Sequence, residues 1–255
     1  MTTATLTVTL AEPVALLGAW PGGAVDEVLD GDDRAYVARL RFDADRAWAR
    51  ASRLLQRLAL SHAVGDVVAP AGWRFEAAPG GRPRVSAPPG APAELAFSVA
   101  NCRGLVGCAV WAGPAATAGG LGFDLEAVPA VVPTEVLPRC FTGDELAALR
   151  GVPAAAQAAR FAAMWTVKEA YLKARGVGLA APLQRFAVRF GAAGSAPTLA
   201  IDPALDDDGA RWRVVAWQAD AGHAAALCLA GAAAALVPVV RWLSPGATAC
   251  AGPGG

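Results

Sequence analysis

Two long helical segments, each accompanied by its own strands, most constrain what this chain can fold into. The first, Asp43 to Leu60, is rich in arginine and carries leucines at helical spacing. The second, Ala154 to Ala174, is followed by Gly176, a natural helix C-terminus. This arrangement predicts an α+β fold made of two similar α+β subdomains that are related by a pseudo-twofold and meet near residue 115.

Short segments around the helices have the composition or alternation of β-strands. The predicted strands are Thr5–Leu10, Leu95–Val99, Leu105–Trp111, Gly120–Glu126, Arg185–Phe190, Arg211–Trp217 and Ala224–Leu229. Pro79–Pro92 is predicted to be a loop, and Thr142 is predicted to start a helix. We therefore expect an N-terminal subdomain over residues 1–115, a C-terminal subdomain over 116–243 and a disordered tail over 244–255.

Charge and cysteine content exclude several classes of protein. Lys plus Arg and Asp plus Glu are both 22, so neither a nucleic acid nor an anionic membrane is an expected partner. The five cysteines form no C-x-x-C pair, which argues against a disulfide framework or a structural zinc site. Ala224–Val240 carries no charge over 17 positions, but it is rich in alanine and is interrupted by Gly231 and Pro238. We expect a buried strand over Ala224–Leu229 there, followed by a loose segment. Because the first basic residue is Arg34, we expect a protein of the cytoplasm, and we expect it to be a monomer.

The sequence Gly122-Phe123-Asp124-Leu125-Glu126 places two carboxylates on one face of a strand, because side chains two residues apart point to the same side. Adjacent carboxylates repel each other unless a cation lies between them, and Mg²⁺ prefers such oxygen ligands. An exposed acidic strand end is the alternative interpretation.

The second helix carries a stripe of chemically active residues. Trp165, Glu169 and Lys173 follow one another at intervals of four and so share a helix face. The chain has twenty arginines but only two lysines, Lys168 and Lys173, both in this helix. Lysine can give up its proton where arginine cannot, so this choice favours a chemical role over an ordinary surface ion pair.

Two segments of the chain, about forty residues apart, together resemble the two signature motifs of the Sfp-type 4′-phosphopantetheinyl transferases. They are G-F-D-L-E and W-T-V-K-E-A-Y-L-K-A-R-G-V-G-L. Trp73–Pro83 is similar to the family's coenzyme A loop, and Cys140–Glu145 also resembles the family. The resemblance covers most of residues 40–230. It implies the 4′-phosphopantetheinyl transferase fold, with the coenzyme A side in the first subdomain.

The resemblance also implies a function and a metal. Such an enzyme moves the phosphopantetheine arm of coenzyme A to a serine of an apo acyl or peptidyl carrier protein and releases 3′,5′-ADP. Asp124, Glu126 and Glu169 would hold Mg²⁺, with Asp124 and Glu169 also counted as catalytic and Glu169 deprotonating the serine. Lys173 would stabilise or protonate the leaving group, and Lys168 would help to bind the phosphates. The carrier would dock near Gly176–Pro182, through contacts such as Leu179.

The same resemblance implies that the nucleotide end of coenzyme A contacts residues of the first subdomain. They are Arg46, Arg82, Pro83, Ala100, Asn101 and Arg103. The sequence departs from the family at Ala100 and Asn101, where the family commonly has Ser and His, so binding of the 3′-phosphate would depend on Arg103 or on Arg46. The register of the first helix is ambiguous, because Trp48 could stand at the position of the family's arginine.

Two other functions stay open from the sequence. Another Mg²⁺-dependent phosphotransferase or hydrolase on the same scaffold would need no carrier protein. A non-catalytic homologue that binds a carrier or coenzyme A is compatible with the missing histidine.

Overall fold

The computed structural model describes residues 4–20, 23–77, 83–86, 94–114, 116, 120–178, 181–192 and 195–243. Its helices and strands form two compact units. Unit 1 consists of Met1–Thr117 with Leu236–Gly255, and unit 2 consists of Ala118–Ala235. Within the described ranges no helix is long and apolar enough to span a membrane.

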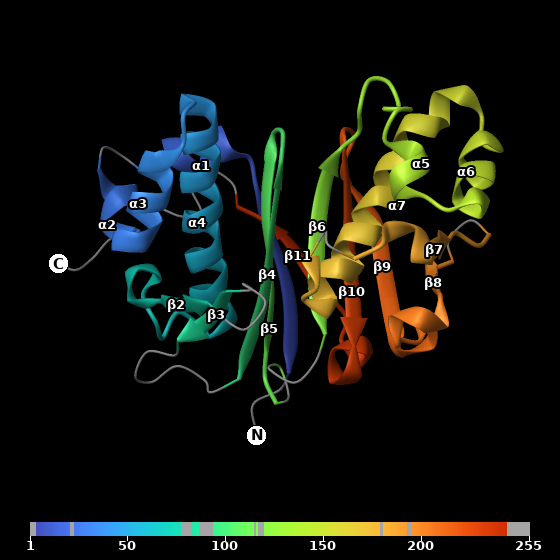
Figure 1. The fold of residues 1–255 in the computed structure, drawn as a ribbon. Helices are drawn as coiled ribbons and strands as arrows, with labels where there is room; N and C mark the ends of the chain where they lie inside the picture. The colour runs from blue at the N-terminus through green and yellow to red at the C-terminus, as the bar shows by residue number, and fades with distance from the viewer. Residues whose placement is uncertain are drawn as a thin grey trace. The chain divides into compact units, whose positions relative to one another are not determined.

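Unit 1 is built on a four-stranded sheet with the order β11-β1-β5-β4 (Figure 1). Its strands are β1 (Thr5–Ala11), β4 (Leu95–Cys102), β5 (Leu105–Ala112) and β11 (Val239–Trp242). A separate pair joins β2 (Arg74–Ala77) to β3 (Pro83–Ser86). The helices are α1 (Pro13–Gly18), α2 (Ala24–Val28), α3 (Gly31–Arg39), α4 (Asp43–Ala63) and the 3₁₀ turn η1 (Pro70–Gly72).

Helix α4 covers the sheet of unit 1 because its leucines recur on one face (Figure 1). Leu54, Leu55 and Leu60 are all fully buried. The first two join Val106 of β5 in one core cluster, whereas Leu60 packs with Phe97 of β4 in another.

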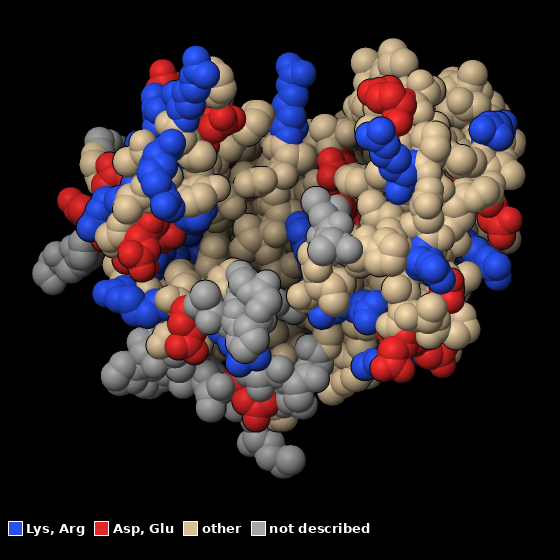
Figure 2. Space-filling view, in the orientation of Figure 1, with Lys and Arg blue, Asp and Glu red and all other residues tan. Residues whose placement is uncertain are grey.

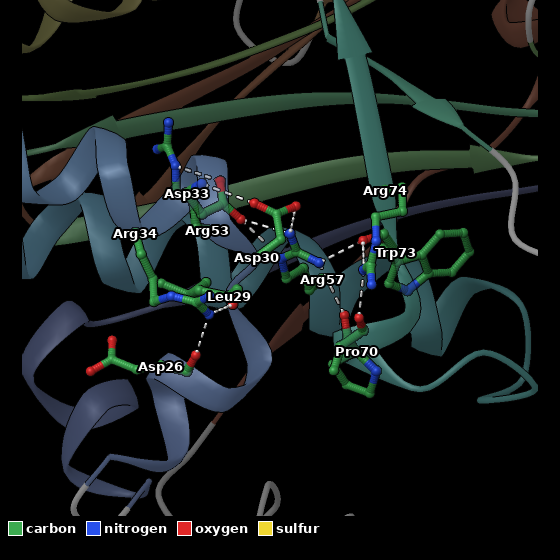
Figure 3. Close-up of polar contacts among 11 residues, drawn as sticks. Asp26, Leu29, Asp30, Asp33, Arg34, Arg53, Arg57, Pro70, Trp73 and Arg74 are labelled. Carbon is green, nitrogen blue, oxygen red and sulfur yellow. Dashed lines mark hydrogen bonds and ion pairs between the residues drawn. The ribbon is translucent and has the colours of Figure 1, made fainter.

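A buried arginine ties this helix to its neighbours (Figure 3). Arg57 of α4 has no exposed surface, and its guanidinium donates hydrogen bonds to Asp30 at 2.6 Å and to Asp33 at 2.7 and 3.1 Å. A further bond of 2.8 Å reaches the Trp73 carbonyl. Burial alone would raise the pKa of Asp30, but the amide of Asp33 and the guanidinium of Arg57 lower it. Arg57 thus joins α4 to the start of α3 and to the strand pair β2-β3.

Unit 2 consists of the antiparallel sheet β6-β10-β9, a two-stranded pair and three helices (Figure 1). The strands are β6 (Leu121–Ala127), β7 (Phe186–Arg189), β8 (Thr198–Ile201), β9 (Trp212–Asp220) and β10 (His223–Ala230). The helices are α5 (Leu137–Cys140), α6 (Gly143–Arg150) and α7 (Ala154–Arg175), with 3₁₀ turns η3 (Leu183–Arg185), η4 (Pro203–Leu205), η5 (Gly209–Arg211) and η6 (Gly231–Ala235).

The long helix α7 packs on this sheet and ends where the sequence predicted. Its Val167 and Tyr171 lie in one buried cluster with Ala226 and Cys228 of β10. Gly176 follows the helix with a φ of 70°, a left-handed conformation that costs glycine little.

The predicted α+β class is confirmed, because each unit packs a long helix on a largely antiparallel sheet. The predicted pseudo-twofold stays a prediction. The predicted loop at Pro79–Pro92 is wrong over Pro83–Ser86, which pairs with β2 as β3. The tail over 244–255 lies outside the described residues.

The last described strand differs from the expected subdomain boundary. The sequence placed residues 116–243 together, with a loose segment after Leu229. Instead, β11 pairs in parallel with β1, with Thr7 opposite Val239 and Leu10 opposite Trp242. The backbone N–H and C=O groups along the edge of β1 pair with this short strand, so residues 236–243 group with unit 1.

We expect Arg57→Met to destabilise unit 1 by about 3 kcal/mol, because it removes a buried cation, leaves Asp30 without its ion-pair partner and leaves Asp33 with Arg53 alone. Urea denaturation followed by circular dichroism measures the change. Arg74→Met is the matched control, since the guanidinium of the exposed Arg74 donates to the Ala71 and Trp73 carbonyls and pairs with no carboxylate among the described residues. A variant as stable as the wild type would contradict this role for Arg57.

Candidate active site in unit 2

A glycine brings helix α7 into direct contact with strand β6. A Cβ atom on Gly122 would lie 1.9 Å from the carbonyl oxygen of Ala170 and 2.4 Å from the amide nitrogen of Ala174. Any larger residue would push helix and strand apart. The glycine of the G-F-D-L-E sequence therefore sets the distance between the carboxylates of β6 and the side chains of α7.

Asp124 is the deepest carboxylate of the site. Its side chain is 7% exposed, and its Oδ1 accepts a hydrogen bond of 2.7 Å from Nζ of Lys173. Its other oxygen, Oδ2, is buried and has no hydrogen-bond partner among the described residues. Burial raises the pKa of Asp124, while Lys173 opposes the rise.

Glu126, two residues along the same strand, is held by the indole of Trp165, whose Nε1 donates to its Oε1 at 3.0 Å. The pKa of Glu126 is raised to about 7, first by burial and then by the negative charges of Asp124 and Glu169. The indole and Lys173 oppose this rise. Trp165 itself lies against Phe141, with 6.2 Å between the ring centroids.

Glu169, one helical turn after Trp165, completes the group. Its Oε1 is buried and has no hydrogen-bond partner in the described part of the chain. Burial and the negative charge of Asp124 raise the pKa of Glu169, and Lys173 lowers it. The structure thus brings Asp124, Glu126, Glu169 and Lys173 within electrostatic reach of one another. The spacings predicted the shared face within each element, and the resemblance implied that the two faces meet.

This arrangement fits a hard divalent cation in its donor chemistry. Two buried carboxylate oxygens, on Asp124 and Glu169, lack a hydrogen-bond partner within the described ranges, and oxygen atoms of this kind suit Mg²⁺. Among the described residues, however, no three acidic, His or Cys side chains are arranged as a metal site. The ammonium of Lys173 lies on Asp124.

Lys168 lies apart from this group. Its side chain is fully buried and its Nζ lies 2.9 Å from both carboxylate oxygens of Glu145. Glu145 is the third residue of a capping box at the start of α6, where its Oε2 accepts from the Thr142 amide at 2.7 Å. The motif lysine and the acid of the Cys140–Glu145 segment therefore pair with each other, a contact that the sequence analysis missed.

The predicted nucleotide contacts belong to unit 1. Arg46 of α4 pairs with Asp43 and donates to the Leu40 carbonyl at 2.6 Å. It lines a cavity of about 410 Å³ together with Arg34 and Arg50, two arginines that sequence reasoning did not single out. Because these residues are separated in the sequence and come from two helices, only the fold could show that they share a cavity.

The other predicted contacts lie on or next to strands. Ala100 is buried in β4, while Asn101 is exposed near its end, and Arg103 lies exposed in the turn to β5. Pro83 starts β3, and Arg82 lies outside the described residues. On the face drawn in Figure 2, basic and acidic side chains are intermixed over the helices of unit 1. This mixture agrees with a net charge of zero.

The match to a family model lies within unit 2. Residues 120–228 match the family model described as the 4′-phosphopantetheinyl transferase superfamily. A curated relative, the L-aminoadipate-semialdehyde dehydrogenase-phosphopantetheinyl transferase of Eremothecium gossypii, is 38% identical over 163 residues. That match covers 62% of this chain and 54% of the relative, so the chain spans about half the length of that protein.

Solved structures of holo-[acyl-carrier-protein] synthases are also similar. The Thermotoga maritima protein has a TM-score of 0.35 at 23% identity, with 44% of this chain and 62% of that chain covered. The Bacillus anthracis protein, in complex with CoA (3′,5′-ADP), has a TM-score of 0.35 at 20% identity, with 44% and 94% covered.

We expect the buried carboxylates to make the protein less stable as the pH rises. A raised pKa means that the folded state keeps a proton which the unfolded chain releases near pH 4.5, so the stability falls between about pH 4.5 and about pH 7. Glu126→Gln removes this titration. In metal-free buffer the Tm of Glu126→Gln minus that of the wild type should therefore increase as the pH is raised from 5 to 8.

Glu135→Gln is the control, because Glu135 is exposed and its Tm difference from the wild type should stay constant with pH. Parallel curves for the wild type and Glu126→Gln would contradict the raised pKa of Glu126.

Proposed function

Since the expected resemblance to the 4′-phosphopantetheinyl transferases is confirmed over residues 120–228, we propose that this chain modifies carrier proteins. The reaction transfers the 4′-phosphopantetheine arm of coenzyme A to a serine of an apo acyl or peptidyl carrier protein and releases 3′,5′-ADP. The observation that carries the proposal is the convergence of Asp124, Glu126, Glu169 and Lys173 within the matched region.

Asp124, Glu126 and Glu169 are the residues that hold Mg²⁺ in this proposal. The buried oxygens of Asp124 and Glu169 that have no partner among the described residues support it, because a buried carboxylate oxygen without a donor is costly unless a cation binds there. When bound, Mg²⁺ supplies neutralisation of the charge that builds on the leaving phosphate.

Glu169 is the proposed general base. It takes the proton of the carrier serine while the serine oxygen forms a bond to the phosphorus that carries the pantetheine arm. The bond between that phosphorus and the oxygen bridging to the second phosphate breaks, and its electron pair leaves with 3′,5′-ADP.

Lys173 stabilises the departing group in the same proposal. Its ammonium lies beside Asp124, and its side chain is 33% exposed, so it can reach a substrate at the surface of the site. A compact cation next to the breaking bond stabilises the negative charge of the leaving phosphate, and it can also donate a proton.

The nucleotide end of coenzyme A is assigned to unit 1 by the resemblance alone. The proposed contacts are Arg46, Arg82, Pro83, Ala100, Asn101 and Arg103. The cavity lined by Arg34, Arg46 and Arg50 is also lined by Asp26 and Asp43, which pair with Arg50 and Arg46, so its lining is of mixed charge. The carrier protein docks near Gly176–Pro182, where the proposed apolar contact Leu179 lies outside the described residues.

We predict that Glu169→Gln lowers the rate of transfer by at least about 1000-fold, because it removes both the proposed base and a metal ligand. Mass spectrometry of apo carrier proteins incubated with coenzyme A, Mg²⁺ and the variant measures the reaction. Glu135→Gln should transfer the arm at the wild-type rate. Full activity of Glu169→Gln would reject the assignment.

The same assay separates the alternatives. A wild type that binds a carrier but adds no mass would indicate a non-catalytic homologue, and turnover of coenzyme A without a carrier would indicate another phosphotransferase or hydrolase.

We also predict that Lys173→Arg keeps the positive charge and still lowers kcat by about 100-fold, because guanidinium is larger and does not release a proton at neutral pH. Steady-state kinetics with saturating coenzyme A measures this effect. Arg189→Lys, the reverse exchange at an exposed position of β7, should leave kcat unchanged. Wild-type kcat for Lys173→Arg would show that only the charge at this position matters.

A further inference from the structure

The bonds of Lys168 leave no donor for a substrate. An ammonium has three N–H groups. The Nζ of Lys168 donates to both carboxylate oxygens of Glu145 at 2.9 Å and to the Phe186 carbonyl at 2.7 Å. The side chain has no exposed surface, and its Nζ lies 4.3 Å from the centroid of the Phe186 ring. All three N–H groups of Lys168 are therefore used by Glu145 and Phe186.

Glu145 is equally occupied, and its contacts reach three elements. Besides Lys168 of α7, it accepts from the Thr142 amide at 2.7 Å, at the start of α6. It also accepts from the Val188 amide of β7 at 2.9 Å. The side chain of Glu145 is 1% exposed. The pair therefore fixes where α7 lies relative to α6 and β7.

Lys168 directly precedes Glu169 in α7, so the ion pair of Lys168 with Glu145 affects how Glu169 is oriented. Successive side chains of a helix point about 100° apart, so fixing the direction of Lys168 also fixes the direction of its neighbour Glu169. The buried Oε1 of Glu169 has no partner of its own in the described ranges. The orientation of the helix is thus what aims this carboxylate, and Lys173 one turn later, at Asp124.

We propose that Lys168 and Glu145 are positioning residues, whose buried ion pair orients helix α7 so that Glu169 and Lys173 face the carboxylates of β6. This inference rests on the proposed function and replaces the phosphate contact that the resemblance implied for Lys168. It predicts that the pair can be replaced without loss of coenzyme A binding, provided that no buried charge is left alone.

Three variants test it: Lys168→Met, Glu145→Gln and the double variant. Each single change leaves one buried charge without its partner, whereas the double change leaves none. Changes to residues behind a site typically cost 10- to 100-fold, so we expect Lys168→Met to lower kcat by about that factor. The double variant should recover to within about 10-fold of the wild type, with the KM for coenzyme A unchanged in all three.

A phosphate contact by Lys168 would give the opposite pattern. The double variant would then be at least as slow as Lys168→Met, and the KM for coenzyme A would rise in both, which would overturn the positioning role. If a single variant does not fold, the coenzyme A affinity of the double variant tests the positioning role by itself. Calorimetry should give it a Kd for coenzyme A close to that of the wild type, and clearly weaker binding would overturn the inference.

A matched control uses the exposed ion pair between Arg185 and Asp202, which lie 2.8 Å apart in the same unit. Arg185→Gln, Asp202→Asn and their double variant should leave kcat unchanged. A wild type that modifies no carrier refutes the proposed function itself. An active wild type whose double variant stays as slow as Lys168→Met refutes only the positioning role.

Discussion

The contact of α7 with β6 at Gly122 is the constraint on which the site depends. With a hydrogen atom in place of a side chain, the strand lies against the backbone of the helix at Ala170 and Ala174. This distance lets Lys173 reach Asp124 and brings Glu169 within electrostatic reach of the same carboxylate. Gly122 therefore sets both the packing of α7 on β6 and the distances between the charged groups, because a wider spacing would separate Lys173 and Glu169 from Asp124.

This close contact gathers more negative than positive charge at the site. Three carboxylates have raised pKa values, and burial is the largest cause in each case. One ammonium, that of Lys173, counteracts all three. Such an excess of buried negative charge destabilises a folded protein unless something positive binds. Perturbed carboxylates of this kind are typical of functional sites, and they support the cation that we propose for this one.

The sequence predicted the parts of the site that depend on local periodicity. The period of two along β6 put Asp124 and Glu126 on one face, and the period of four along α7 aligned Trp165 with Glu169 and Lys173. The bond from Trp165 to Glu126 follows when those two faces meet. Elements with weak periodicity were missed, such as β11 and the short helices α1 to α3. Their placement depends on tertiary pairing, which no local pattern records.

The roles of the two lysines also depend on tertiary contacts that the local sequence does not record. Their rarity among twenty arginines indicated that an ammonium was needed, but not for which purpose. At Lys173 the need is a compact cation beside a carboxylate at the site. At Lys168 it is a buried group whose three donors match three acceptors, two on Glu145 and one on Phe186. Arg57 meets a wider set of acceptors with a planar guanidinium. The shape of the acceptor set, which forms only on folding, therefore decides which cation a buried position requires.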